Sequence, residues 1–361
     1  MRRLWMSLMK GFLLVFAGLF SHGCQPEQGP KTVIIQLVEP KLVVTEEGVK
    51  LETRPGKTLA YKEVIESSPN VKSVTRLTEN EDKNMVIGPP VLSPTQDIMV
   101  YWEMPIRIVR DASYGARLSR QSNIYKQAIG SPAKTRITYG ERTDLYPTFS
   151  PDGNDLVFSS NRTGPNPTLW RISLAGGGGI TKITTTLAED YAPYVSPDDS
   201  FIVYASNPPG AEEPQIWKVN SNGLLPTQLR VGRSPQVSPD GTKILFIRVD
   251  KDSGKKQLWV MSIDGSEETQ LTSNTDFDID HARWSPDGQK IVYASDEGVD
   301  SQKRHNFDIW MMDTDGTNKT QLTTNGSHDD SPCWDRHGKV IYFRSNRGGM
   351  WNIWRFEPIM P

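Results

Sequence analysis

Short apolar runs separated by polar turns repeat along this chain at a nearly constant interval. Six of the runs place an aromatic residue at their centre, and these residues are Tyr125, Trp170, Trp217, Trp259, Trp310 and Trp354. Successive centres lie 45, 47, 42, 51 and 44 residues apart. A four-stranded blade of a β-propeller needs roughly 40–50 residues, so the pattern predicts six blades in one large domain.

Each repeat contains four runs that predict four strands. The first follows a Pro-x-apolar-Ser pattern, as at residues 147–150, 193–196 and 235–238, and a Pro-Asp-Gly turn often comes next. This turn is favoured because proline presets φ, aspartate bonds its own backbone and glycine accepts a positive φ. A β-branched and aromatic run comes second, the aromatic-centred run third and a polar-apolar-Thr run fourth.

The order of the runs indicates how the ring closes. A copy of the fourth run, around Leu77, precedes the first repeat, whereas the chain ends just after a third run, at Phe356. A strand near Leu77 that pairs beside residues 353–356 would complete the last blade and hide its open edge. We therefore predict an all-β fold, a six-bladed β-propeller closed by an N-terminal outer strand, over residues 71–361. Residues 24–70 carry no repeat and are expected to form a tether or small extension.

The N-terminus has the layout of a secretory signal peptide, predicted here as residues 1–23. Basic residues precede an apolar run at 11–20 that is too short to span a bilayer, and small residues follow. We expect export to the periplasm or the outer membrane. Gly23-Cys24 resembles the end of a bacterial lipobox, which implies a lipid anchor on Cys24. Ser21 stands where that pattern prefers Leu, so simple cleavage after Gly23 is the alternative.

Composition narrows the range of partners. Charged residues make up 23% of the chain and its net charge is −2. Because there is no basic surplus, we expect no nucleic-acid partner. Besides Cys24 the chain has one cysteine, Cys333, which lies in an apolar run and is expected to act as a small buried hydrophobe.

The repeats resemble those of the TolB-type (TolB-like, PD40) β-propeller family over residues 71–357. The resemblance rests on the Ser-Pro-Asp-Gly turns, the apolar strand after them, the Ile-Trp third strand and the Gln-Leu-Thr fourth strand. It implies a periplasmic protein that binds partner proteins of the cell envelope. The family's namesake has a larger α/β domain than residues 24–70 provide, so the contacts of that domain do not carry over. The fold alone does not define the function, because one fold hosts many.

Acidic residues gather in loops that should share one face of the propeller. These loops, from each fourth strand to the next first strand, carry Asp144, Asp190, Asp278, Asp280, Asp329 and Asp330. Around a channel mouth they would focus negative potential. Two interpretations are open: the carboxylates bond neighbouring loops and fix one blade against the next, or they bind a cation or a basic peptide.

A long connection between the second and third strands of the first blade, residues 104–123, interrupts the repeat. It carries Arg107, Arg110, Arg117 and Arg120. Long loops in compact domains are often functional, and the alternative is a solvated loop. We expect a basic flap beside the acidic mouth.

Three histidines are expected on the same face, with carboxylates beside them: His281, His328 and His305. Such a set could hold a divalent metal. Sugar-cleaving lyases with TolB-like repeats use such a metal, but the spacing here matches no recognised ligand motif. We therefore predict no cofactor and no catalytic residues, and keep a metal at these histidines as the alternative.

The leading hypothesis is a non-catalytic binding or scaffold protein of the bacterial cell envelope that holds a protein or peptide on this face. It rests on the family resemblance and on the lack of a nucleophile elbow, a phosphate loop or a zinc helix in the sequence. The alternative is a metal-dependent, lyase-like enzyme that acts on carbohydrate at the same face.

Overall fold

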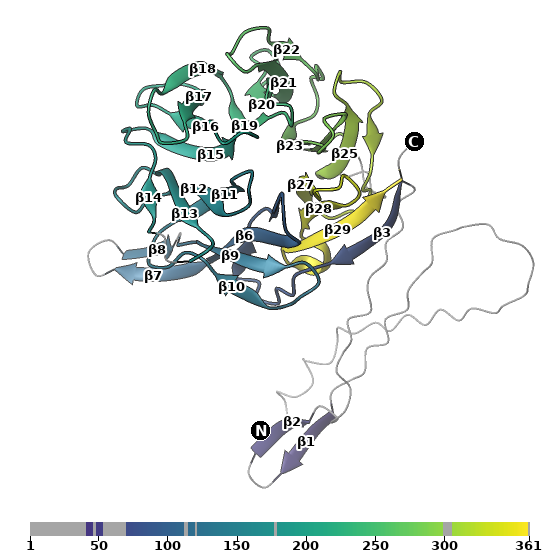
Figure 1. Ribbon diagram of the computed structural model, residues 1–361. Helices are drawn as coiled ribbons and strands as arrows, with labels where there is room; N and C mark the ends of the chain where they lie inside the picture. Colours follow the sequence, from purple (N-terminus) through teal and green to yellow (C-terminus); the bar gives the residue numbers. More distant parts are fainter. Residues whose placement is uncertain are drawn as a thin grey trace, which may run out of the picture. The chain divides into compact units, whose positions relative to one another are not determined.

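The computed structural model describes residues 41–45, 48–52, 70–111, 115–119, 121–176, 179–298 and 305–359. Six antiparallel sheets surround a central axis, which confirms the predicted six-bladed β-propeller (Figure 1). Within the described ranges no helix is long and apolar enough to cross a membrane. A separate two-stranded hairpin, β1 (Lys41–Thr45) with β2 (Gly48–Glu52), lies in the stretch that precedes the repeats.

Four blades follow the chain in order, from the inner strand beside the axis to the outer strand. Their strands are β11 (Asp144–Phe149), β12 (Asp155–Ser160), β13 (Thr168–Ser173) and β14 (Thr181–Lys182) in blade 2; β15 (Glu189–Val195), β16 (Phe201–Asn207), β17 (Gln215–Asn220) and β18 (Thr227–Val231) in blade 3; β19 (Arg233–Val237), β20 (Lys243–Val249), β21 (Lys256–Ser262) and β22 (Thr269–Gln270) in blade 4; and β23 (Ile279–Trp284), β24 (Lys290–Ser295), β25 (Asp308–Asp313) and β26 (Thr320–Gln321) in blade 5.

Blade 6 joins the two ends of the propeller. It contains β27 (Asp329–Trp334), β28 (Ile341–Ser345) and β29 (Asn352–Pro358), and its outer strand is β3 (Val71–Arg76) from the start of the repeats. Trp354 pairs with Arg76 and Phe356 with Val74, and the Leu77 amide donates to the Ile353 carbonyl at 2.8 Å. The predicted closure by an N-terminal strand is confirmed.

Blade 1 departs from the four-strand pattern. Its sheet runs β10 (Lys134–Arg136), β9 (Asn123–Ala128), β6 (Ile98–Pro105) and then two short inner pieces, β4 (Met85–Ile87) and β5 (Val91–Leu92). Gly88 lies between the two pieces, where a Cβ would come within 2.2 Å of the Trp102 ring. Only glycine fits this close approach, and the prolines that follow it cannot donate to a ladder.

The connection at residues 104–123 contains a two-stranded hairpin, where the sequence suggested a loop. β7 (Arg107–Asp111) pairs with β8 (Gly115–Ser119), from Arg107 opposite Ser119 to Asp111 opposite Gly115. The β-branched pair Ile108-Val109 favours a strand. Because the hairpin lies outside the four-strand period, the repeat pattern gave no sign of it.

The hydrophobic core is divided into six clusters, each between neighbouring blades. Val157 and Leu169 of blade 2 pack with Tyr204 of blade 3, for example. At the closure, Ile353 of blade 6 packs with Met99 and Tyr101 of blade 1. Because every blade buries both of its faces against neighbours, stability depends on completing the ring.

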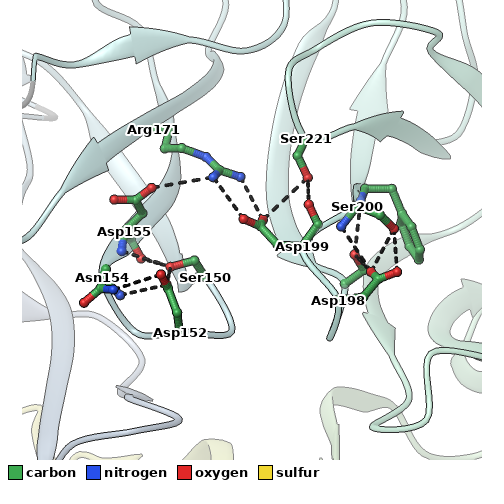
Figure 2. A network of polar contacts seen from close by, with 11 residues as sticks. Ser150, Asp152, Asn154, Asp155, Arg171, Asp198, Asp199, Ser200 and Ser221 are labelled. Atoms are coloured by element: carbon green, nitrogen blue, oxygen red, sulfur yellow. Dashed lines mark hydrogen bonds and ion pairs between the residues drawn. The ribbon is translucent and has the colours of Figure 1, made fainter.

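The Ser-Pro-Asp-Gly turns, which join the first strand of a blade to the second, lie on one face of the propeller, which we call the turn face. Hydrogen bonds within these turns stabilise that face. In the first full repeat, Ser150 Oγ bonds Asp152 at 2.5 Å and accepts from the Asp155 amide at 2.9 Å (Figure 2). The hydrogen bond from Ser150, followed by those from the Asn154 amide and side chain, holds the pKa of Asp152 below its usual value. Arg171 of blade 2 then reaches Asp199 of blade 3 at 3.1 Å, so the turns also join adjacent blades.

Candidate functional site

Each inner strand of blades 2 to 6 contains a β-bulge near the face that carries the fourth-to-first loops, here called the loop face. At every bulge one residue other than glycine has a left-handed backbone, with φ between 49° and 55°: Tyr146, Ala192, Ser234, His281 and Ser331. Such a conformation costs roughly 1–3 kcal/mol per residue and is concentrated at functional sites. Five strained residues lie at equivalent positions around the central axis. We therefore take the loop-face end of the inner strands as the candidate site.

Three of the six predicted aspartates lie two residues before a strained residue and are fully buried: Asp144, Asp190 and Asp329. Asp144 pairs with Arg162 at 2.8 Å, and Asp329 pairs with Arg347. Asp190 accepts from Ser206 at 2.7 Å and from Thr186 at 2.7 Å. These carboxylates are bound by side chains of the same blade or of the loop that precedes it.

Asp280 and Asp330 lie one residue before a strained residue, and Asp280 lines the cavity at the loop face. Arg344 makes two bonds to Asp330, at 2.8 and 2.5 Å. Burial opposes the charge of Asp330, but the Arg344 guanidinium and the His328 hydrogen bond outweigh it and hold its pKa well below the usual range. Asp280 pairs with Lys256 at 2.6 Å. Asp278 lies further out, where its carboxylate accepts from the Lys256 amide at 2.9 Å.

The three candidate histidines make separate contacts. His281 lines the channel, and its Nδ1 is buried with no hydrogen-bond partner among the described residues. His328 bonds Asp330 at 3.2 Å and lies between the rings of Phe307 and Trp351, at centroid distances of 5.0 and 5.4 Å. His305 Nδ1 lies 3.0 Å from the Asp296 carbonyl. Among the residues placed by the structure, no group of three or more His, Cys, Asp or Glu side chains could hold a metal ion.

The basic flap remains a prediction. Arg107 and Arg110 are on β7 and Arg117 is on β8, but their side chains lie outside the described part of the protein, as does Arg120. Cys24 also lies outside it.

A channel between the inner strands contains two cavities. The cavity at the loop face has a volume of about 270 Å³ and the one at the turn face about 420 Å³. The second residue of each Pro-x-apolar-Ser motif lines them, which gives one residue per blade: Val91, Thr148, Tyr194, Gln236, Arg283 and Cys333. We call these six residues the channel ring.

Aromatic side chains lie on the loop face, and two of them, Tyr146 and Tyr191, line its cavity. Tyr146 is 43% exposed and its ring centroid lies 6.0 Å from that of Tyr191. Arg344 stacks 4.3 Å above the Trp351 ring, beside His328. The sequence analysis missed these residues and the channel ring, although the second position of the Pro-x-apolar-Ser repeat was the signal that could have found the ring.

Comparisons with known proteins agree with the repeat pattern. The family described as TolB beta propeller domain (PD40) matches residues 110–253. An uncharacterized protein of Agrobacterium fabrum is 40% identical over 72 residues, which are 20% of this chain and 22% of that protein. The chain thus matches about a fifth of the length of this curated relative.

Solved structures share the fold. A putative TolB from Agrobacterium tumefaciens superposes with a TM-score of 0.55 and 20% identity, over 76% of this chain and 91% of that one. An oligogalacturonate lyase in complex with manganese gives a TM-score of 0.51 and 16% identity, over 79% of this chain and 93% of the lyase. At these identities the likeness extends to the fold alone.

Proposed function

Because this chain is a six-bladed β-propeller of the TolB type, we propose that it is a non-catalytic binding protein of the bacterial cell envelope. It holds a protein or peptide partner on the loop face. The signal-like N-terminus supports export, and a lipid on Cys24 would keep the protein at the membrane.

The observation that carries the proposal is a set of aromatic side chains on the loop face, here called the aromatic rim. Tyr146 and Tyr191 line the cavity at the loop face, and His328 and Trp351 contact each other in two loops of blade 6. Tyr146 is exposed yet fixed, because its backbone is held at φ 51° by the bulge and its ring packs on Tyr191. Rigid tyrosines provide large contact area at low entropic cost. Tyr, Trp and Arg are also the residues that dominate binding energy at protein interfaces.

The pairing of the loop-face charges also favours binding over catalysis. Asp144, Asp329 and Asp330 are each neutralised by an arginine. A general acid or base needs a titratable group that can exchange a proton with a substrate. Carboxylates fixed in ion pairs instead give a rigid surface on which the aromatic rim is presented.

Photo-crosslinking in intact cells tests this proposal. A photoreactive phenylalanine analogue placed at position 146 should capture a specific partner that mass spectrometry identifies. Tyr146→Ala should then lower recovery of that partner at least about tenfold, as for an interface hot spot. Leu224→Ala removes a large, 61% exposed side chain from a third-to-fourth strand loop, which lies on the turn face, and serves as the control. Equal recovery with both variants would place the binding surface elsewhere.

Elemental analysis separates this proposal from the lyase alternative. We expect purified protein to melt at the same temperature with and without EDTA. A stoichiometric metal, lost together with cleavage of an acidic sugar, would favour the enzyme instead.

A further inference from the structure

The channel ring contains a single charged residue. Five blades contribute the uncharged Val91, Thr148, Tyr194, Gln236 and Cys333, whereas blade 5 contributes Arg283. Arg283 lines both cavities, so it lies where they meet, a level that we call the channel waist. A molecule that enters from either side can reach it there.

This guanidinium has no partner among the residues that the structure describes. Three other arginines of the loop face are each paired with a carboxylate: Arg162 with Asp144, Arg344 with Asp330 and Arg347 with Asp329. Arg283 makes neither a hydrogen bond nor an ion pair there. Arg233 also lines the cavity at the loop face, here called the upper cavity. Its side chain likewise has no hydrogen bond and no ion pair within the described ranges.

No carboxylate of the described residues forms an ion pair with Arg283. Asp335, which lines the cavity at the turn face, accepts from the Lys339 and Val340 amides instead. Burial lowers the pKa of Arg283, and its titratable neighbours are Cys333 and Tyr194. Burial raises the pKa of Cys333 to about 12 and also raises that of Tyr194, so both stay uncharged. The carboxylate that lines the upper cavity, Asp280, is already bound to Lys256. A desolvated and uncompensated cation is costly to the fold, which suggests that the site has a purpose.

Further hydrogen-bonding atoms face the same cavity. Trp102 Nε1, His281 Nδ1 and Ser331 Oγ are buried there without a partner in the described protein. Buried polar groups are usually satisfied, and the indole and hydroxyl groups can both donate. The residues that carry these groups and the two arginines therefore line the same cavity.

We propose that the channel waist is a binding site for a small carboxylate-bearing molecule, held by Arg283 with Arg233 and the neighbouring donors. A carboxylate accepts two parallel bonds from the planar guanidinium. The volume of about 270 Å³ lies near the lower end of the roughly 300–1,000 Å³ of small-molecule sites, which suits a small organic acid. The site does not depend on the protein partner proposed for the aromatic rim.

Isothermal titration calorimetry of the purified full-length mature protein with malonate at low ionic strength tests this site. Arg283→Gln should weaken malonate binding about 10- to 100-fold, the effect of losing a charge-assisted bond. Arg142→Gln, which removes the same charge from an exposed loop-face residue, should bind as the wild type does. Thermal melting should show Arg283→Gln to be folded, because the substitution removes an uncompensated charge.

Three results would overturn the proposal. One is the absence of malonate binding to the wild type at millimolar concentrations, and another is equal affinity in the wild type and a folded Arg283→Gln. Tighter binding of sulfate than of malonate would overturn the assignment to carboxylates.

Discussion

At the scale of single residues, Asp308 links the fold to pH. This aspartate is 1% exposed and accepts from Gln321 at 3.1 Å and from Thr323 at 3.2 Å. Burial, and then the nearby charge of Asp329, raise its pKa to about 8. The folded protein thus holds this proton more tightly than the unfolded chain, so the stability that it contributes is present below about pH 4 and is lost as pH rises toward 8.

We predict that Asp308→Asn removes this pH dependence. The amide mimics the protonated acid, so near pH 4 the variant and the wild type should have similar melting temperatures. As the pH rises to about 8, the melting temperature of the variant should exceed that of the wild type by an increasing amount. A pKa shift of this size corresponds to a gain on the order of a few kcal/mol. Melting curves between pH 4 and 9 measure the effect. Asp276→Asn changes an exposed carboxylate and should leave the profile unaltered, whereas parallel profiles for Asp308→Asn and the wild type would contradict the assignment.

Which residues line the site could be predicted only in part. The sequence located the aspartates of the loop face but not their burial, because a β-bulge changes the alternation of side chains at that point. The bulges here occur at Tyr146, Ala192 and Ser234, which have a positive φ although none is glycine. No local signal distinguishes such residues from ordinary strand residues, so Asp144 and Asp190 could be placed near the mouth but not inside the blade.

At the scale of elements, buried ion pairs fix the connections between the second and third strands of blades 2 and 6. Arg162 follows β12 and pairs with Asp144 of β11, and its guanidinium lies 5.2 Å from the Trp170 ring centroid on β13. The pair therefore ties three strands of blade 2 together. Arg347 repeats the arrangement in blade 6 with Asp329 and Trp354.

We predict that Arg162→Met destabilises the protein by about 3–5 kcal/mol, because Asp144 is left as an unpaired buried charge. Adding Asp144→Asn should recover part of this loss, since it removes the charge. Urea unfolding of the two variants measures the difference. If the double variant were as unstable as the sum of its single variants, the two residues would act independently and the anchor role would be wrong.

The elements themselves were largely predictable, and the exceptions have a physical reason. A fixed period places strands well when every unit buries the same faces, as in β12 (Asp155–Ser160) and β16 (Phe201–Asn207). The hairpin of β7 and β8 has no counterpart in other blades, so periodicity could not reveal it. The split of the inner strand of blade 1 at Gly88 depends on the position of the Trp102 ring, which only the folded chain defines.

At the scale of the whole molecule, the strand β3 closes the ring. Val74 is 1% exposed and belongs to a cluster that includes Phe343 and Phe356 of blade 6. The sequence predicted this closure by counting strands alone, because a blade without its outer strand would expose an edge. The six inter-blade clusters are consecutive around the ring, so a break at the closure exposes two blades at once.

We predict that deletion of residues 70–80 abolishes cooperative unfolding. The deletion removes β3 and Leu77, and the open edge of β29 together with the exposed inter-blade surface should give a broad transition. A milder test is Val74→Ala, which should cost about 1–3 kcal/mol as a buried large-to-small substitution. Lys72→Gln on the same strand is the control, because its ion pair with Glu357 at 3.2 Å is exposed and should contribute at most about 1 kcal/mol. Calorimetric melting measures all three, and a sharp, unshifted transition in the deletion variant would mean that the ring is stable without its closing strand.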